Sequence, residues 1–446
     1  MERDMTKGNP YKIIMSFTLP IFIGNVFQQF YNMADTIIVG KFVGTKALAA
    51  VGSTGTVMFL ILGFLMGFTA GVTVSTSQKY GAGDVRAMKR TVVSAVLLSA
   101  VMAALMTVAS VLFMKPLLLL MNTPEDIFND AYSYIIIICA GIAAQVLYNL
   151  LSSILRALGN SKTPLFFLVL AALLNIVLDL VFIIFFHAGT AGAAWATVIS
   201  QGISGLLCLL YIVKKVEVLR IEKDDLKISG KIVKTQLKIG FPMALQYSIT
   251  AIGTIMVQSA LNMLGSLVVA AFTAASKIEQ LVTQAYVALG TTMATYCAQN
   301  TGAGEYERIK HGFRAANVFG FAYAVALGIP LMFFGKYLTN MFISENINEI
   351  IPNVDIYLKC VGAFFIPLSM VNSYRNGIQG MGYGLLPMCA GVAELVARGV
   401  VAVIAAICSS YVGICFASPA AWIFAGGLLL VMYICIMHSK KIKSAV

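Results

Sequence analysis

Long apolar stretches occupy most of the 446 residues, and they constrain the fold more than any other feature of the sequence. An α-helix needs about 20 mainly apolar residues to cross a bilayer, whose interior offers no water to hydrogen-bond an open backbone. Charged residues make up 11% of the chain, whereas a soluble globular domain carries roughly 25%. The sequence therefore predicts an all-α integral membrane protein. Twelve stretches are expected to be transmembrane helices: 13–40, 47–77, 91–120, 129–156, 164–186, 190–213, 239–264, 268–298, 313–335, 352–380, 386–411 and 414–437.

The two halves of the chain share a pattern of turn residues. Residues 78–84 read QKYGAGD, residues 299–305 read QNTGAGE, and the Gly159 and Pro164 of the first half recur as Gly382 and Pro387. Six spans per half give both repeats the same orientation, so we expect two six-helix bundles related by a pseudo-two-fold axis along the membrane normal. The predicted parts are an N-lobe at 1–213, a cytoplasmic linker at 214–238 and a C-lobe at 239–446.

The basic residues are distributed unevenly between the predicted loops. The net charge is +12, and Lys and Arg concentrate in the N-terminal segment, the 78–90 and 305–314 regions, the linker and the C-terminus. The opposite loops keep only Lys41, Lys46, Lys115 and Lys336. This distribution follows the positive-inside rule, so the charge does not indicate a nucleic-acid partner. We expect a multi-pass protein of the plasma membrane (the bacterial inner membrane) with both termini in the cytoplasm. We also expect no removable signal peptide, because no short apolar core with a small-residue cleavage site follows the charged N-terminus.

Motifs for cofactor or nucleotide chemistry are missing from the sequence. The eight cysteines have no CxxC spacing, the three histidines are scattered, and neither Gly-Ala-Gly turn is followed by Gly-Lys-Ser/Thr. No Gly-x-Ser-x-Gly nucleophile is present either. We expect a monomer that is not an enzyme, contacts only membrane lipid and small molecules, and draws any transport energy from an ion gradient.

Two carboxylates within the apolar stretches point to a function. A carboxylate costs about 2.5–3.5 kcal/mol at the centre of a membrane helix, so Asp35 and Asp179 are expected to face an interior site. Asn175 shares the helix face of Asp179 one turn away, and Thr197 of the next stretch lies at a similar predicted depth. These oxygen ligands suit Na⁺, and the two carboxylates can instead carry H⁺. Caps for neighbouring helices or the wall of a vestibule are the alternative roles.

Other polar residues, together with a proline and three glycines, are expected to have further roles. Pro20 interrupts the first stretch and is either a hinge or a static kink. Glycines at 63, 67 and 71 form a stripe that favours close helix packing. Lys277 with Glu279, and Glu394 with Arg398, are expected to be structural charge pairs. The residues expected to line a substrate cavity are Gln28, Asn32, Met33, Asn149, Gln258, Gln280, Gln284 and Asn372.

The combination of these features resembles the multidrug and toxic compound extrusion (MATE) antiporters. The resemblance rests on Leu19-Pro20 and Asp35, QxxGAG in both turns, Arg156-Ala-Leu-Gly-Asn with Pro164, and Asn175-x-x-x-Asp179. It implies two six-helix bundles that export organic cations in exchange for Na⁺ or H⁺ by alternating access. It further implies a cation site at Asp35, Asn175, Asp179 and Thr197, and bending of the first helix at Pro20.

One departure concerns the C-lobe. The NorM branch of this family carries acidic residues in helices seven and ten, but 242–262 and 366–375 contain no Asp or Glu here. A DinF-like or MepA-like branch is therefore favoured. When the two halves are aligned by the repeat, Arg398 is equivalent to Asn175 and Ala402 to Asp179, and the counterpart of Asp35 falls near Met256 to Gln258. The carboxylates are therefore not duplicated. A flippase for lipid-linked saccharides is the alternative function, although the predicted helices offer few basic residues beyond Arg375 and Arg398.

Overall fold

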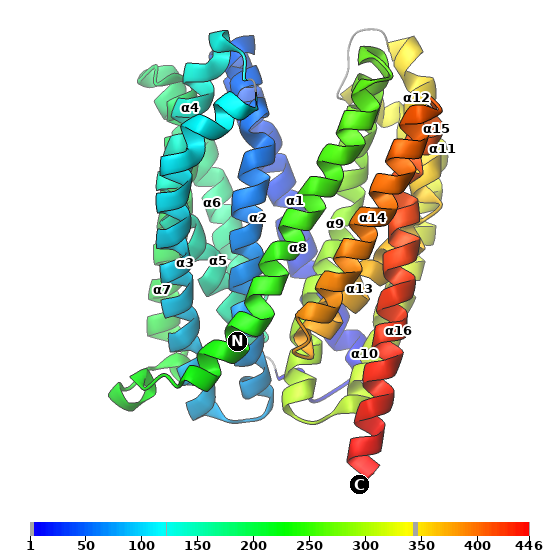
Figure 1. The fold of residues 1–446 in the computed structure, drawn as a ribbon. Coiled ribbons are helices and arrows are strands. Elements are labelled where there is room, and N and C mark those ends of the chain that lie inside the picture. Colours follow the sequence, from blue (N-terminus) through cyan, green and yellow to red (C-terminus); the bar gives the residue numbers. More distant parts are fainter. Residues whose placement is uncertain (1–3, 122, 342–346, 446) are drawn as a thin grey trace. The chain divides into compact units, whose positions relative to one another are not determined.

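The computed structural model describes residues 4–121, 123–341 and 347–445, and these residues are almost entirely helical (Figure 1). Nine of their helices are long and apolar enough to cross a membrane. Two pairs of shorter helices meet the same standard as bent spans, α4 (Glu125–Ala140) with α5 (Ile142–Ala157) at 48°, and α12 (Ile347–Gly362) with α13 (Phe365–Gly380) at 51°. The nine helices and the two bent pairs together give eleven candidate spans. The eighth predicted span is the long helix α9 (Ser266–Gly302), which carries Lys277 and Glu279 and is not among these eleven. The protein is an all-α membrane protein, as the sequence predicts.

Packing divides the chain into two compact units. Unit 1 comprises Ile23–Tyr247 and the residues up to Asp4, and unit 2 comprises Met5–Phe22 and Ser248–Val446. The helices of unit 1 besides α4 and α5 are most of α1 (Pro10–Phe42), α2 (Thr45–Gly81), α3 (Val85–Leu120), α6 (Lys162–Leu180), α7 (Gly189–Lys215) and the first half of α8 (Gly230–Asn262). Unit 2 contains the first part of α1 and the last part of α8, together with α9, α12 and α13. Its other helices are α10 (Tyr306–Tyr323), α11 (Ile329–Phe334), α14 (Leu385–Ile407), α15 (Tyr411–Cys415) and α16 (Ala417–Ala445).

The internal repeat is visible in the lengths of the elements. Helices α1 and α8 both have 33 residues, α2 and α9 both have 37, and all four helices of the bent pairs have 16. The turns repeat as well, because Gly83 and Gly304 both have positive φ (71° and 78°), as do Gly159 and Gly382 (81° and 94°). Only glycine adopts that conformation without strain. The Gly-Ala-Gly motifs are therefore structural turns, as their composition indicates.

The second copy of the turn motif also holds the start of the chain within unit 2. Met5 N donates to Gln299 Oε1 (2.9 Å), and Arg308 donates to the carbonyl oxygens of Met5 (3.2 Å) and Gly8 (3.0 Å). Asn300 Oδ1 accepts from Arg308 Nε (3.0 Å), and Met5 is fully buried among the apolar residues of this unit. These bonds explain why the first turns of α1 pack with unit 2 although the rest of α1 packs with unit 1.

The polar connector between the halves is an ordered part of unit 1. Residues 216–229 contain two short 3₁₀ turns, Glu217–Leu219 and Lys223–Leu226. Val216 and Leu219 join the apolar core around α2 and α5, and Lys89 Nζ lies 3.8 Å from Asp225 Oδ2. The sequence halves at 1–213 and 239–446 describe the repeat, whereas the units describe packing, and the two partitions differ at α1 and α8.

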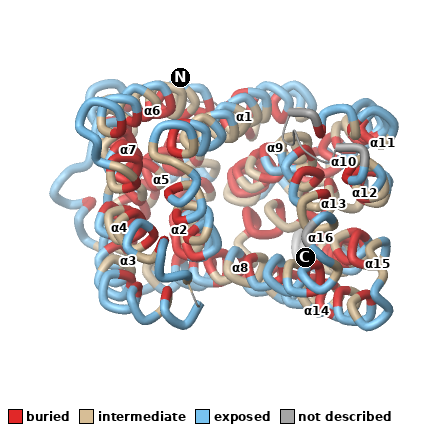
Figure 2. Tube along the Cα trace, turned by 90° about the horizontal axis from the view of Figure 1, so that it is seen from above, coloured by how far each residue is buried: buried red, intermediate tan, exposed pale blue. Residues whose placement is uncertain are grey.

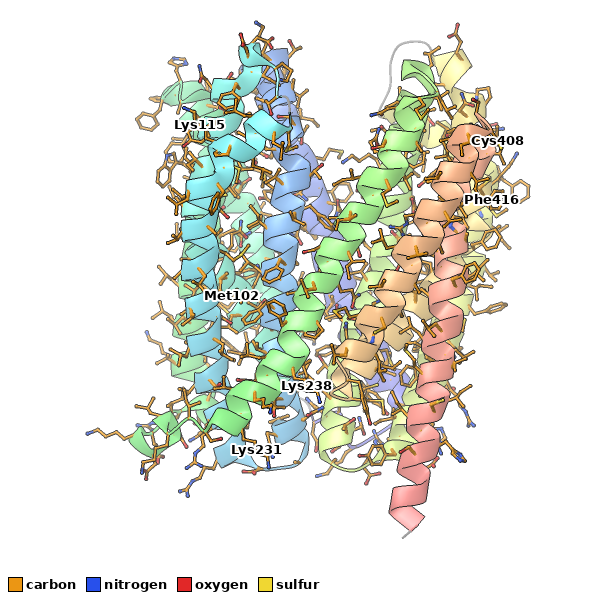
Figure 3. All side chains as sticks on the ribbon, in the orientation of Figure 1. Met102, Lys115, Lys231, Lys238, Cys408 and Phe416 are labelled. Carbon is orange, nitrogen blue, oxygen red and sulfur yellow. The ribbon has the colours of Figure 1, made fainter. Side chains whose placement is uncertain are left out.

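Within unit 1, lysines lie at both ends of the helices. Lys231 and Lys238 of α8 lie at the opposite end of the unit from Lys115 of α3, with Met102 between (Figure 3). Figure 2 shows that the buried residues of α7 lie on its inner face and the exposed residues on its outer face. The exposed positions are mostly large and apolar, including Leu206, Leu210 and Val213, as expected for a surface that faces lipid.

Candidate functional site

Asn175 and Asp179 form the centre of a polar cluster inside unit 1. They lie one turn apart on α6 and are 1% and 0% exposed. With the amide of Asn175 oriented so that both its ends are satisfied, its nitrogen donates to Asp179 Oδ2 (3.0 Å) and its oxygen accepts from Thr197 N (3.3 Å). The same end of the amide lies 3.3 Å from Thr197 Oγ1 on α7. The structure therefore brings together three of the residues that the sequence singles out.

Asp35 of α1 completes this predicted set. Its carboxyl group and that of Asp179 lie within hydrogen-bonding reach of each other. Ionised carboxylates only accept hydrogen bonds, so this contact requires a proton, or another cation in its place, between the two groups. The Oδ1 atoms of both aspartates are buried and have no hydrogen-bond partner among the described residues. Two oxygens with free lone pairs thus remain at the contact between α1 and α6.

Two tyrosines of this cluster were missed by the sequence analysis. Tyr31 lies one turn before Asp35 on α1, and its hydroxyl is hydrogen-bonded to the side chain of Thr197. Tyr134 of α4 is 4% exposed and lies near enough to Tyr31, Asp35 and Asp179 to interact with them electrostatically. The spacing of four residues between Tyr31 and Asp35 is a signal that the sequence offers. Nothing in the sequence relates Tyr134 to the aspartates, because only the packing of α4 places it there.

The donor set determines what this cluster can bind. Carboxyl, carboxamide and hydroxyl oxygens are hard ligands, which suit alkali and alkaline-earth cations, and the carboxyl pair is also suited to a proton. Among the described residues, no three His, Cys, Asp or Glu side chains gather in a group able to hold a metal ion. The ligands of any bound cation would therefore include the amide, the hydroxyl groups or water. No basic side chain contacts the aspartates in the described contacts, so a bound cation would balance their charge.

Pro20 lies within an unbroken helix. It is buried in α1, and the division between the units falls just after it, between Phe22 and Ile23. The helix continues through the proline to Phe42. Its role as a hinge remains a prediction.

The residues expected to line a substrate cavity are spread over both units. In unit 1, Asn32 and Met33 are exposed and Gln28 and Asn149 are half-buried. In unit 2, Gln258 donates to Asn262 Oδ1 (2.9 Å) and Asn372 donates to Leu368 O (3.0 Å), so each makes a bond within its own helix. Gln280 is exposed and Gln284 half-buried, one turn apart on α9. Among the described residues, no hydrogen bond or ion pair joins these eight side chains into one site, and their role stays a prediction.

The charged residues of unit 2 form a group that is larger than the sequence indicates. Arg398 Nη2 donates to Glu394 Oε1 (2.7 Å), as expected for residues one turn apart on α14. The other oxygen of Glu394 accepts from Arg375 of α13, a partner that the sequence does not reveal. Glu279 is paired with the hydroxyl of Tyr357 on α12, and the adjacent Lys277 is exposed. The expected Glu394–Arg398 pair is present, but it belongs to a buried triad.

Comparisons with known proteins identify the same relatives by sequence and by fold. The sequence model of the MatE family matches residues 20–181 and 239–404. The chain is 33% identical to the probable multidrug resistance protein YpnP of Bacillus subtilis strain 168, over 84% of this chain and 83% of that protein. It is 26% identical to the probable multidrug resistance protein NorM of Thermotoga maritima, over 84% of this chain and 81% of that protein. A solved structure of a multidrug resistance MATE family transporter in an outward-facing conformation shares the fold with a TM-score of 0.92, at 23% identity over 98% of both chains.

Proposed function

This chain belongs to the MatE family of multidrug efflux transporters, and on that premise we propose that it exports amphipathic organic cations in exchange for Na⁺ or H⁺ by alternating access. The observation that carries the proposal is the carboxyl pair of Asp35 and Asp179, which leaves two buried oxygens without partners. A transporter that uses an ion gradient needs a group that binds the ion inside the membrane, and a carboxylate there is costly unless it has such a role.

The pair also offers a way to couple ion binding to helix movement. With a proton or Na⁺ bound, the carboxyl groups of α1 and α6 attract the same cation and hold the two helices together. Without it, two adjacent negative charges in a medium of low dielectric constant repel each other strongly. Loss of the ion would therefore favour a shift of α1 relative to α6 within unit 1. Pro20 of α1 is a candidate for the position at which the helix bends.

The alternative of a saccharide–lipid flippase is less well supported. Such a substrate carries phosphate groups, for which free arginines would be expected. Arg375 and Arg398 are the arginines that the sequence singles out for such a role, and Glu394 already pairs with both. We further propose a monomer in the bacterial inner membrane with both termini in the cytoplasm, and no nucleotide or enzymatic step is required.

Drug efflux from cells tests the assigned site. The wild type, Asp35→Asn and Asp179→Asn are expressed in a bacterium that lacks its own exporters, and the rate of ethidium efflux is measured. Both substitutions are expected to reduce efflux to near the background rate, because an amide cannot exchange a proton and binds Na⁺ poorly. Asp126→Asn is the matched control, since Asp126 is exposed and lies 3.7 Å from Lys46. Wild-type efflux in both site variants would show that the site is assigned wrongly.

Reconstituted protein identifies the ion. Proteoliposomes are given either a Na⁺ gradient or a proton gradient alone, and ethidium movement is followed in each. Transport driven by one gradient and not by the other assigns the coupling ion. Transport that proceeds equally without either gradient would contradict the proposal of an antiporter.

A further inference from the structure

The counterpart of the ion site in unit 2 contains an arginine. Gly159 and Gly382 begin equivalent turns with positive φ, and Asn175 and Arg398 both follow sixteen residues later, on α6 and α14. At the next turn of the helix, Asp179 is matched by Ala402, which is buried. The helix bounds of α1 and α8 match Asp35 with Ile255, one residue before the range that the sequence repeat indicates. Unit 2 therefore carries the guanidinium group of Arg398 at the position where unit 1 has the side-chain amide of Asn175.

The Arg398 side chain is held from several helices of unit 2. It is 7% exposed and donates to Glu394 on its own helix. Glu279 of α9 lies near enough to interact with it electrostatically. A Cβ atom on Gly253 of α8 would lie 2.9 Å from Arg398 Nη1, so the absence of a side chain there makes room for the guanidinium. In the repeat, Gly253 matches Met33 of α1, two residues from Asp35.

The two clusters differ in charge balance. In unit 1, Asp35 and Asp179 have no basic residue among their described contacts, so they need a cation from solution. In unit 2, the carboxyl groups of Glu279 and Glu394 are matched by the guanidinium groups of Arg375 and Arg398. The Tyr357 hydroxyl supplies a further hydrogen bond to Glu279. The second cluster is therefore neutral without any mobile ion.

We propose that Arg398 is a tethered cation that occupies, in unit 2, the place equivalent to the coupling-ion site of unit 1. Its guanidinium stays with Glu394 and Glu279, so unit 2 neither binds nor releases Na⁺ or H⁺ during transport. Arg398 thereby limits the protein to a single coupling site. This inference rests on the proposed function, because it takes the aspartate cluster of unit 1 as the coupling site.

The prediction is that removing the tethered charge creates a cation site. Asp35→Asn/Asp179→Asn protein, purified in detergent, is expected to lose saturable binding of ²²Na⁺ or, if the ion is H⁺, the proton uptake that the wild type shows on acidification. Adding Arg398→Gln to this background leaves Glu394 and Glu279 with one guanidinium and should restore one saturable site for Na⁺ or H⁺. Adding Arg398→Lys should restore none, because the ammonium group keeps the charge.

Other variants separate this outcome from a change in folding. Each protein is first required to elute as a single species in size-exclusion chromatography. If Arg398→Gln does not, Arg398→Asn, which puts at this position the residue type of the equivalent Asn175, is used in its place and should create the same site. Adding Glu394→Gln to the restored protein should abolish binding again, since it removes the carboxylate on which the new site depends.

Two results would overturn the inference. The first is a cation site that persists in Asp35→Asn/Asp179→Asn protein with Arg398 intact and is lost on adding Glu394→Gln. The second is a folded Arg398→Gln protein that gains no binding of either ion. A failure of the proposed function looks different: Asp35→Asn/Asp179→Asn would then bind cations as the wild type does, whether or not Glu394 is changed.

Discussion

Asp179 and Glu394 show two ways in which a carboxyl group is accommodated inside a membrane bundle. Asp179 is paired with a second carboxyl group and retains an unpartnered oxygen. Glu394 is held by two arginines, so both of its oxygens are satisfied. Burying charge is expensive unless it is paired and hydrogen-bonded, so a carboxyl pair without a basic partner is the arrangement that calls for a cation. This contrast is why we assign ion binding to the aspartates and not to Glu394.

Tyr31 offers a test of the aspartate cluster that leaves both carboxyl groups in place. Tyr31→Phe removes the hydroxyl that is hydrogen-bonded to Thr197. A neutral hydrogen bond contributes about 1 kcal/mol, which corresponds to roughly a five-fold change in an equilibrium constant. We expect the ion concentration for half-maximal ethidium transport in proteoliposomes to rise by about that factor.

Tyr132→Phe is the control for this substitution. Tyr132 lies on the same helix as Tyr134, and its ring stacks on Phe128 with the centroids 6.4 Å apart. It should leave the half-maximal ion concentration unchanged. If Tyr31→Phe behaves like Tyr132→Phe, Tyr31 does not contribute to ion binding.

At the scale of the elements, glycines determine how closely α2 and α8 pack inside unit 1. A Cβ atom on Gly67 would lie 2.6 Å from Met243 O, and one on Gly71 would lie 2.5 Å from Gly240 Cα. Both neighbours are backbone atoms, which cannot move without shifting the helix. The Gly63, Gly67 and Gly71 stripe of the sequence therefore has the close-packing role that its spacing indicates. Gln236 adds to this contact by donating to the carbonyl oxygens of Val72 (3.0 Å) and Thr91 (2.8 Å).

Gly71→Ala is expected to destabilise the protein because its methyl group has no space. Overpacking of a tight contact typically costs about 1–3 kcal/mol. The melting temperature of the purified protein should therefore fall. It can be measured with a thiol-reactive fluorescent dye, or by the loss of the monodisperse size-exclusion peak on heating.

Gly55→Ala is the matched control in the same helix. Nothing lies within 4 Å of a Cβ atom built on Gly55, and the residue is exposed. Alanine is favoured over glycine in a helix by roughly 0.5–1 kcal/mol, so this variant should be as stable as the wild type or slightly more stable. Equal melting temperatures for Gly71→Ala and Gly55→Ala would show that α2 and α8 do not pack as described.

At the scale of the whole molecule, the repeat provides two similar scaffolds that carry different chemistry. The helices, bent pairs and glycine turns recur, but the aspartate cluster is present only in unit 1 among the described residues. Helices α1 and α8 each belong in part to both units. The movement of α1 that we propose for loss of the ion would therefore act on a helix whose preceding segment is held by Arg308 and Gln299 in unit 2.

The predicted orientation of the molecule can be tested by thiol labelling. In a variant without its eight cysteines, Asp84→Cys and Glu125→Cys are introduced singly, near opposite ends of α3. The positive-inside rule places Asp84 in the cytoplasm and Glu125 outside. A membrane-impermeant maleimide added to intact cells should label Glu125→Cys, whereas Asp84→Cys should react only after permeabilisation. The reverse pattern would show that the orientation is inverted.

Several features of this protein are determined by the sequence alone. The apolar stretches predict its helices, because an isolated backbone in lipid must satisfy its own hydrogen bonds. The turn glycines predict the repeat, and the cost of charge in lipid marks Asp35 and Asp179. The spacing of four residues also predicts the Glu394–Arg398 pair, because such residues share a helix face. All of these inferences use interactions within one helix or between one helix and the bilayer.

Other features depend on which helix faces meet, and only the tertiary structure decides these. It brings Tyr134 of α4 beside the aspartates, joins Arg375 to Glu394, and divides α1 and α8 between the two units. Helical periodicity specifies the face on which a side chain lies, but it does not specify the partner of that face. In membranes the partner is selected by close packing and interhelical hydrogen bonds, which depend on the shapes of both surfaces together. For this reason the sequence identifies the aspartates and the arginine at the position equivalent to Asn175, while only the packing of the helices shows which side chains surround each of them.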